Sequence, residues 1–211
     1  MTADFKTGFV LGVQFSPFKG SDASFDMTVG GNVVLRRTGD GMYNLDIRDP
    51  DNVGAVSIAG RLFVDTAMGI STVMARTEAA LSVGKDFTIL NGDGKLTCTL
   101  TDVHVGGKLM MRTGGSKDIV TLAGVIVDGT TLLDTGAGLD ALTISGGTTN
   151  AVSTFAKPMM VKLGADDDSL TLNHANIFKL LADGQAGLNL LTKDDPSLTF
   201  TVLPGTFLHF V

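Results

Sequence analysis

The sequence predicts an all-β fold: a right-handed parallel β-helix of about seven coils with an N-terminal cap. Three observations support this. One phrase returns along most of the 211 residues, and repeats of 20–50 residues are typical of stacked units. Short alternating runs of Thr, Val and Leu are broken by 27 glycines, as expected for strands and tight turns. Apolar residues make up 44% of the chain and charged residues only 18%, which suits a long continuous core.

Residues 1–28 do not match the repeat and are expected to form the N-terminal cap. They concentrate aromatic area, at Phe5, Phe9, Phe15, Phe18 and Phe25. The open end of a stacked-strand body exposes unpaired backbone groups, so an atypical terminal segment is needed to prevent unwanted association.

Residues 29–201 carry the repeats, and the best-defined copy is DTGAGLDALTI at residues 134–144. Successive copies are 28, 25, 22, 22, 28 and 28 residues apart when anchored at Gly39, Ala67, Gly92, Gly114, Gly136, Gly164 and Thr192. A unit of 22 residues with at least two strands and two corners corresponds to about one coil of a parallel β-helix. The longer units are expected to carry loops at 48–57, 146–157 and 173–187, the last with a short helix near 176–181.

The clearest regularity lies six and eight residues after each anchor, where both residues are apolar. These pairs are Leu45/Ile47, Val73/Ala75, Cys98/Leu100, Val120/Leu122, Leu142/Ile144, Leu170/Leu172 and Leu198/Phe200. Two-residue spacing puts both members on one strand face, so the pairs predict an inner surface. The residue between them should point outward, and in the last five coils it is Thr99, Thr121, Thr143, Thr171 and Thr199.

A second apolar strand precedes each anchor, from residues 33–35 in the first unit to residues 188–191 in the last. The chain ends in residues 202–211, which we expect to close the C-terminal end of the solenoid or to join a partner strand.

Composition excludes several classes of partner. The formal net charge is −6 and no basic cluster is present, which argues against nucleic acid as a partner. The apolar stretch at residues 9–18 is too short to span a bilayer, and no other segment reaches that length. The single cysteine, Cys98, excludes an intrachain disulfide framework, and its place in an inner pair predicts a buried thiol.

Asp118, Asp140 and Asp168 occupy the same position in three successive units. Stacked carboxylates repel one another unless a cation or protonation relieves them. The phrases around Asp140 and at residues 164–172 resemble the Gly-x-Gly-x-Asp-x-apolar-x phrase of calcium-binding secreted repeat proteins, although that family repeats its phrase every nine residues. The resemblance implies a calcium site at Asp118, Asp140, Asp166 and Asp168. The alternative is that these residues form turns on a solvated corner.

Two other kinds of site bear on the function of the chain, a glycan-cleaving site and a flat hydroxyl surface. Glycan-cleaving β-helices need acidic residues that converge on one exposed face, but Asp166, Asp167 and Asp168 are adjacent and alternate between faces. We therefore predict no catalytic residue and no bound organic cofactor. The column of Thr99, Thr121, Thr143, Thr171 and Thr199 resembles the flat hydroxyl arrays of ice-binding solenoids, although threonine is also an ordinary residue for an exposed strand.

In broad character the pattern resembles the β-solenoid repeats of bacterial surface and secreted proteins. The resemblance implies no specific activity. The regular coils, few charges, apolar ends and absence of a catalytic constellation instead indicate a non-enzymatic structural or adhesive role, which we expect at the cell surface or outside the cell, with homo-oligomerisation or surface assembly. The first alternative is a glycan-binding or polysaccharide-cleaving β-helix with an acidic site. The second is a binder of ice or another flat surface through the threonine column.

Overall fold

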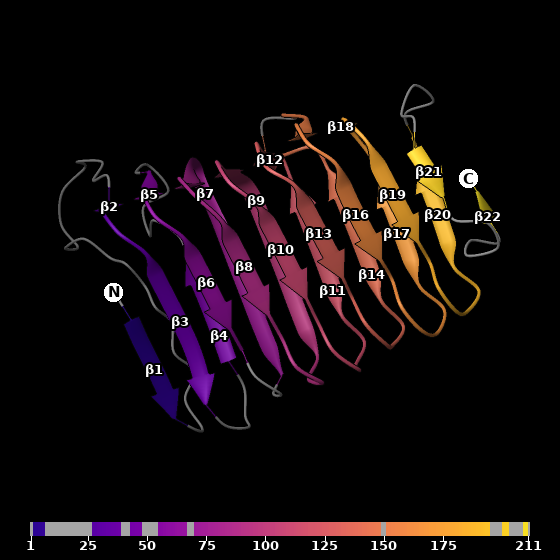
Figure 1. Cartoon of the computed structure of the whole chain (residues 1–211), viewed down its shortest axis with the longest axis horizontal. Helices are drawn as coiled ribbons and strands as arrows, with labels where there is room; N and C mark the ends of the chain where they lie inside the picture. Colours follow the sequence, from indigo (N-terminus) through magenta and orange to yellow (C-terminus); the bar gives the residue numbers. More distant parts are fainter. Residues whose placement is uncertain are drawn as a thin grey trace.

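The computed structural model describes residues 2–6, 27–38, 43–47, 55–66, 70–148, 151–194, 200–202 and 209–210. Within these residues the regular structure is entirely β, and all strand pairing is parallel, each strand pairing with its equivalents in the neighbouring turns. Figure 1 shows the strands side by side along the long axis of an elongated body. The predicted parallel β-helix is confirmed.

Each turn of the solenoid has three faces. The first face is a nine-stranded sheet. Its strands, in spatial order, are β1 (Thr2–Lys6), β3 (Val33–Thr38), β6 (Leu62–Asp65), β8 (Phe87–Leu90), β10 (Leu109–Arg112), β13 (Thr131–Asp134), β16 (Met159–Lys162), β19 (Leu180–Asp183) and β21 (Phe200–Val202).

The second and third faces belong to one 13-stranded sheet, because two long strands, β7 (Ser71–Val83) and β9 (Leu96–Val105), run across the corner between them. The second face holds their first halves with β4 (Tyr43–Ile47), β11 (Ile119–Ala123), β14 (Ala141–Ser145), β17 (Ser169–Leu172), β20 (Leu190–Lys193) and β22 (His209–Phe210). The third face holds their second halves with β2 (Met27–Val29), β5 (Val56–Ile58), β12 (Ile126–Val127), β15 (Ser153–Phe155) and β18 (Ala175–Ile177).

Six turns therefore have a described strand on every face: β3–β5, β6–β7, β8–β9, β10–β12, β13–β15 and β16–β18, and β19 with β20 begins a seventh. The sequence pattern predicts at least two strands per coil and locates two of the three. It misses the third because these strands are two or three residues long in most turns and end directly in turn phrases such as Val127-Asp128-Gly129.

The core follows the predicted inner pairs. In six of the seven, from Leu45/Ile47 to Leu170/Leu172, both side chains are at most 1% exposed. The third face adds residues such as Val105 and Phe155, and the first face adds residues such as Phe87 and Leu133, so the interior is one continuous apolar cluster. Burial of apolar surface of this kind is the dominant stabilising contribution to a fold.

The last predicted unit is out of register with the structure. Leu190–Lys193 is the second-face strand of its turn, since Thr171 pairs with Thr192, and the first-face strand is Leu180–Asp183. Phe200 lies on the first face opposite Leu180, whereas Leu198 and Thr199 lie outside the described residues. The error arises because this turn is 21 residues long, as the pair Ser169 and Leu190 shows, and not 28.

The short helix expected near residues 176–181 is also wrong. This segment contains the end of β18 and the start of β19, joined at Phe178 and Lys179. The residues that mimic helical spacing are instead inward residues of two faces: Ile177 is 5% exposed and Leu180 is fully buried. A corner between two short strands can reproduce the spacing of one helical turn.

Most of the predicted cap lies outside the described residues, which leave out 7–26. Its first part, β1, pairs with β3 and so extends the first face by one strand. In the C-terminal segment, β22 pairs with β20. Among the described residues there is no helix long and apolar enough to cross a membrane.

Candidate functional site

The corner between the first and second faces carries the aspartate column predicted from the sequence. Adjacent turns approach closely here, and Gly136 and Gly164 have φ values of +85° and +98°. A Cβ atom on Gly164 would lie 1.3 Å from the carbonyl oxygen of Gly136. Glycine is therefore required by both conformation and space, since other residues rarely adopt positive φ.

At this corner Asp118, Asp140, Asp168 and Asn189 form a hydrogen-bonded ladder along the solenoid axis. Each side-chain Oδ1 accepts the backbone N–H of the equivalent residue one turn earlier. The N···O distances are 2.6 Å from Leu96 to Asp118, 2.7 Å from Asp118 to Asp140, 2.8 Å from Asp140 to Asp168 and 2.9 Å from Asp168 to Asn189. The ladder satisfies backbone donors that the turn leaves outside the strand pairing.

The three carboxyl groups of the ladder are buried, with at most 3% of each residue exposed. Their Oδ2 atoms are buried without a hydrogen-bond partner. Burial raises the pKa of all three carboxyl groups, chiefly by desolvation. The pKa rises to about 6 for Asp140 and to about 7 for Asp168, and the neighbouring carboxylates contribute to both of these shifts. Burial therefore favours protonation of these carboxyl groups, which is one of the two ways to relieve the repulsion between stacked carboxylates.

Asn189 closes the ladder with a neutral side chain. Its amide group donates to the carbonyl of Gly184 at 2.8 Å and to that of Ala186 at 3.4 Å. Asn189 does not follow from the predicted repeat, because it lies 21 residues after Asp168 and the predicted step is 28. A search for asparagine as well as aspartate at this position of the repeat would have found Asn189.

The predicted calcium residues are only partly brought together. Asp118, Asp140 and Asp168 lie in the ladder, whereas Asp166 is exposed at the corner with φ of +83°. In the described part of the chain, no group of three His, Cys, Asp or Glu side chains is arranged to hold a metal ion. Calcium binding stays a prediction that rests on the aspartate column.

The predicted threonine column lies on the outside of the second face. Thr99, Thr121, Thr143 and Thr171 pair in register from turn to turn, and Thr192 takes the place expected for Thr199. The neighbouring outward residues are also uncharged, from β7 to β20 on one side and from β9 to β14 on the other, where Arg76 of β7 pairs with Thr101. They are Thr72, Thr97, Ile119, Ala141, Ser169 and Leu190 on one side and Thr101, Ala123 and Ser145 on the other. We call this surface the threonine face.

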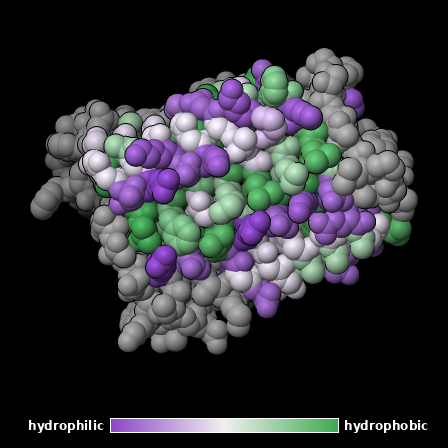
Figure 2. All heavy atoms as spheres, in the orientation of Figure 1, coloured by the Kyte–Doolittle hydropathy of each residue, from purple (hydrophilic) through white to green (hydrophobic). Residues whose placement is uncertain are grey.

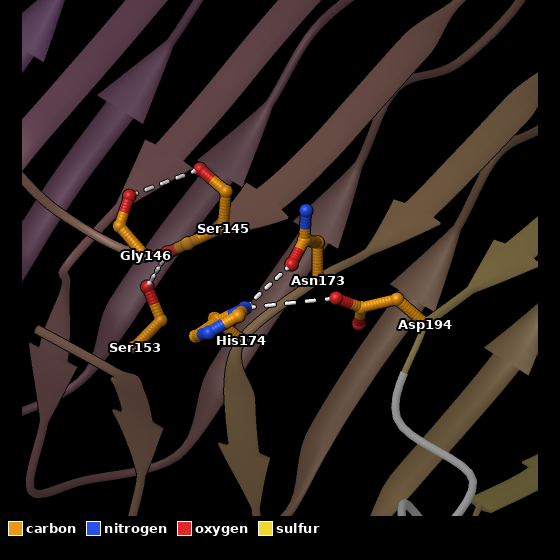
Figure 3. A network of polar contacts seen from close by, with 6 residues as sticks. All are labelled: Ser145, Gly146, Ser153, Asn173, His174 and Asp194. Carbon is orange, nitrogen blue, oxygen red and sulfur yellow. Dashed lines mark hydrogen bonds and ion pairs between the residues drawn. The ribbon is translucent and has the colours of Figure 1, made fainter. Parts of the chain in front are cut away.

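A polar cluster at the corner between the second and third faces contains a serine, a histidine and an aspartate, the residue types of a catalytic triad (Figure 3). The hydroxyl of Ser153 donates to the carbonyl of Ser145 at 2.6 Å and accepts the N–H of Val125 at 3.0 Å. The His174 ring instead contacts Asn173 at 2.8 Å and Asp194 at 3.6 Å.

These contacts divide the cluster in two. Ser153 is fully buried and its hydroxyl bonds serve the corner. A nucleophilic serine needs its base within hydrogen-bonding reach, and in the described structure the partners of His174 are Asn173 and Asp194, as Figure 3 shows. The geometry is that of a structural corner.

Cys98 lies inside the core, as its place in an inner pair predicts. Its side chain is fully buried, and desolvation raises the pKa of the thiol to about 12. Because the thiolate is the reactive form of cysteine, the raised pKa makes this thiol unreactive. Cys98 therefore contributes to the packing of the core.

Comparison with protein-family models, with curated proteins and with solved structures gives no significant match.

Proposed function

We propose that the chain is a non-enzymatic structural or adhesive β-solenoid of a cell surface or of a self-assembling extracellular structure. The observation that carries the proposal is the threonine face. Neighbouring turns of a parallel sheet are about 4.8 Å apart, so its hydroxyl and methyl groups repeat at that spacing along the body. A regular, uncharged surface is suited to contact with another regular surface.

The architecture supports a scaffold role. The inner pairs form one core through all six complete turns, and the aspartate ladder links four successive turns at one corner. Solenoids gain stability from contacts between neighbouring turns, which lets them present long surfaces with a thin core.

The test is adsorption to ordered solids. We expect the chain to bind at least one insoluble polysaccharide, and Thr143→Lys, at the centre of the threonine face, to weaken adsorption about tenfold because the lysine must be desolvated. Thr154→Lys, on the outside of the third face, is the matched control and should adsorb like the wild type. Light scattering and electron microscopy show whether the chain also assembles.

Two results would contradict the proposal. One is a chain that stays monomeric and adsorbs to nothing tested. The other is turnover of an acidic or neutral glycan that disappears in Asp168→Ala, which would favour a polysaccharide-cleaving protein. Asp140 and Asp168 are at most 3% exposed, so a polymer chain has no direct access to either carboxyl group in this conformation.

A second candidate, binding of ice or a similar flat crystal, is favoured by the same face. Threonine presents a methyl and a hydroxyl group together, and the threonine column runs straight through five successive turns from Thr99 to Thr192. Partition into slowly growing ice distinguishes this candidate. Retention of the wild type in ice, but not of Thr143→Lys, would favour it over adhesion to glycans.

A further inference from the structure

The outside of the first face carries a stripe of apolar side chains, one from each turn. The outward residues Val34, Phe63, Thr88, Met110, Leu132, Met160 and Leu181 pair in register from β3 to β19, and all but Thr88 are apolar. We call them the apolar stripe. Figure 2 shows a green band along this side of the molecule between purple groups.

Charged residues border the stripe on both sides. Two residues later along each strand stand Arg36, Asp65, Leu90, Arg112, Asp134, Lys162 and Asp183, here called the trailing row. Its charges alternate in sign except at Leu90. On the other side stand Arg61, Asp86, Lys108, Thr130, Pro158 and Lys179.

The two ends of the stripe differ in shape. Near the C-terminal end, a hollow of about 310 Å³ is bordered by Met160, Leu181 and Lys179. Near the N-terminal end stands Phe63, with the guanidinium of Arg36 lying 5.2 Å from the centre of its ring. One end thus offers an aromatic side chain and the other a hollow.

We propose that two copies of the chain pack face to face through their apolar stripes, related by a two-fold axis that runs parallel to the strands and passes between the two copies of β10. The two solenoid axes are then antiparallel. A two-fold interface places each feature opposite a different feature of the same surface, which matches the unequal ends of the stripe. This inference deepens the proposed scaffold function by naming a second copy as the partner.

The register follows from the charges of the trailing row. With the axis at β10, Arg36 of one copy lies opposite Asp183 of the other, and Asp65 lies opposite Lys162. Phe63 of each copy then lies opposite Met160, beside the hollow. Moving the axis half a turn in one direction places Asp65 against Asp183, and in the other direction Arg36 against Lys162. Like charges in contact are costly, so both shifts are disfavoured.

On the axis itself, Met110 meets the second Met110 and Arg112 meets the second Arg112. Asp134 lies next to Arg112, with 4.0 Å between Nε and Oδ2, and reduces the repulsion between the two guanidinium groups. Methionine is adaptable and packs well against an identical side chain.

The area of the stripe that is available for contact sets the expected affinity of the dimer. Seven turns at strand spacing and the three rows of side chains give a patch of roughly 30 Å by 20 Å, about 600 Å² per copy. Stable interfaces typically bury about 800 Å² per partner, so a dimer with micromolar affinity is expected.

Sedimentation equilibrium at concentrations up to about 100 µM should therefore show a reversible monomer–dimer equilibrium. Met110→Lys places two ammonium groups at the axis and should weaken the dimer at least about tenfold. Thr121→Lys, in the same turn but on the threonine face, is the control and should leave the dimer unchanged.

The register is tested by reversing one charge pair. Asp183→Arg should weaken the dimer, because it places Arg36 of the other copy against a second guanidinium group, and adding Arg36→Asp should restore it. Met110→Cys should form a disulfide-linked dimer on oxidation, whereas Leu181→Cys should not, because its two copies lie roughly 29 Å apart along the solenoid in this register.

A chain that remains monomeric at the highest concentration overturns the inference, as does an oligomer that Met110→Lys leaves intact. Failure to restore the dimer in the double charge reversal, or linkage of Leu181→Cys in place of Met110→Cys, overturns the register. The proposed function fails separately: it is lost if the chain neither assembles nor adsorbs, and it survives if a monomer adsorbs to solids or if assembly uses another surface.

Discussion

At the scale of single residues, the chemistry of this chain is concentrated in three buried aspartates. Asp118, Asp140 and Asp168 each use one oxygen for a backbone N–H and leave the other without a partner. An ionised carboxylate in such a place is costly, and a neutral carboxylic acid is much less so. Protonation is therefore part of the native state of this corner at mildly acidic pH.

The first prediction concerns pH. Folding raises the pKa of Asp140 to about 6 and that of Asp168 to about 7, chiefly by desolvation. From about pH 4 to 7 the unfolded chain thus releases protons that the folded chain retains, and stability falls as the pH rises. We expect the free energy of unfolding to drop on the order of 4 kcal/mol between pH 5 and pH 8, measured by urea denaturation.

The double variant Asp140→Asn/Asp168→Asn should flatten this pH dependence, because an amide keeps the Oδ1 acceptor without the charge, as Asn189 does in the native ladder. Asp93→Asn, at an exposed position, should leave it unchanged. A wild type that is as stable at pH 8 as at pH 5 would show that the aspartates ionise without cost.

The second prediction concerns Gly164, where both φ and the space beside Gly136 exclude a side chain. Gly164→Ala should lower the free energy of unfolding by more than about 2 kcal/mol, since the corner must move to admit the methyl group. In Gly115→Ala the nearest atom to the new Cβ would be a side-chain oxygen of Asp93 at 3.6 Å, an ordinary contact. This control should change stability by less than about 0.5 kcal/mol.

At the scale of elements, the solenoid depends on register. The inner pairs were predictable in six turns because alternation on a strand is a direct consequence of backbone geometry, and residues such as Val120 and Leu122 are buried as expected. The last turn was misplaced because residues 188–191 and the true first-face strand, Leu180–Asp183, are both short apolar runs. The third-face strands are too short to show alternation.

The third prediction tests the corrected register in β20. Leu191 points into the core and is 1% exposed, whereas its neighbour Leu190 is 38% exposed on the threonine face. Leu191→Ala should lower the free energy of unfolding by about 2–5 kcal/mol, whereas Leu190→Ala should cost less than about 1 kcal/mol. Equal effects in denaturant unfolding would show that β20 is not oriented as described.

At the scale of the whole molecule, the solenoid presents three different faces from one short repeat. The first face carries the apolar stripe with its charged borders, and the second carries the uncharged threonine face. Each is continuous because the register is held from turn to turn. A binding surface on such a body is a property of many turns, and no single turn contains it.

The fourth prediction concerns calcium and the stability of the whole chain. A ligand that binds only the folded state raises its stability, by about 2.7 kcal/mol at a concentration a hundredfold above the dissociation constant. At pH 5, where protonation relieves the repulsion in the aspartate ladder, we expect neither a chelator nor millimolar Ca²⁺ to shift the thermal unfolding midpoint. A rise with Ca²⁺ that disappears in Asp140→Asn would show instead that the corner binds the ion.

The sequence by itself determined the fold class, the inner pairs and the stacking of Asp118, Asp140 and Asp168, because these depend on local alternation and on a repeat that one turn imposes on the next. The tertiary structure decided what the sequence left open: the third face, the lengths of the last turns, the role of Asn189 and the burial that raises the pKa values of the ladder aspartates. It also assembled the apolar stripe, whose members are 21 to 29 residues apart in the chain and become neighbours only when the turns stack. The physical reason is that burial and side-by-side contact between turns are absent from any single repeat.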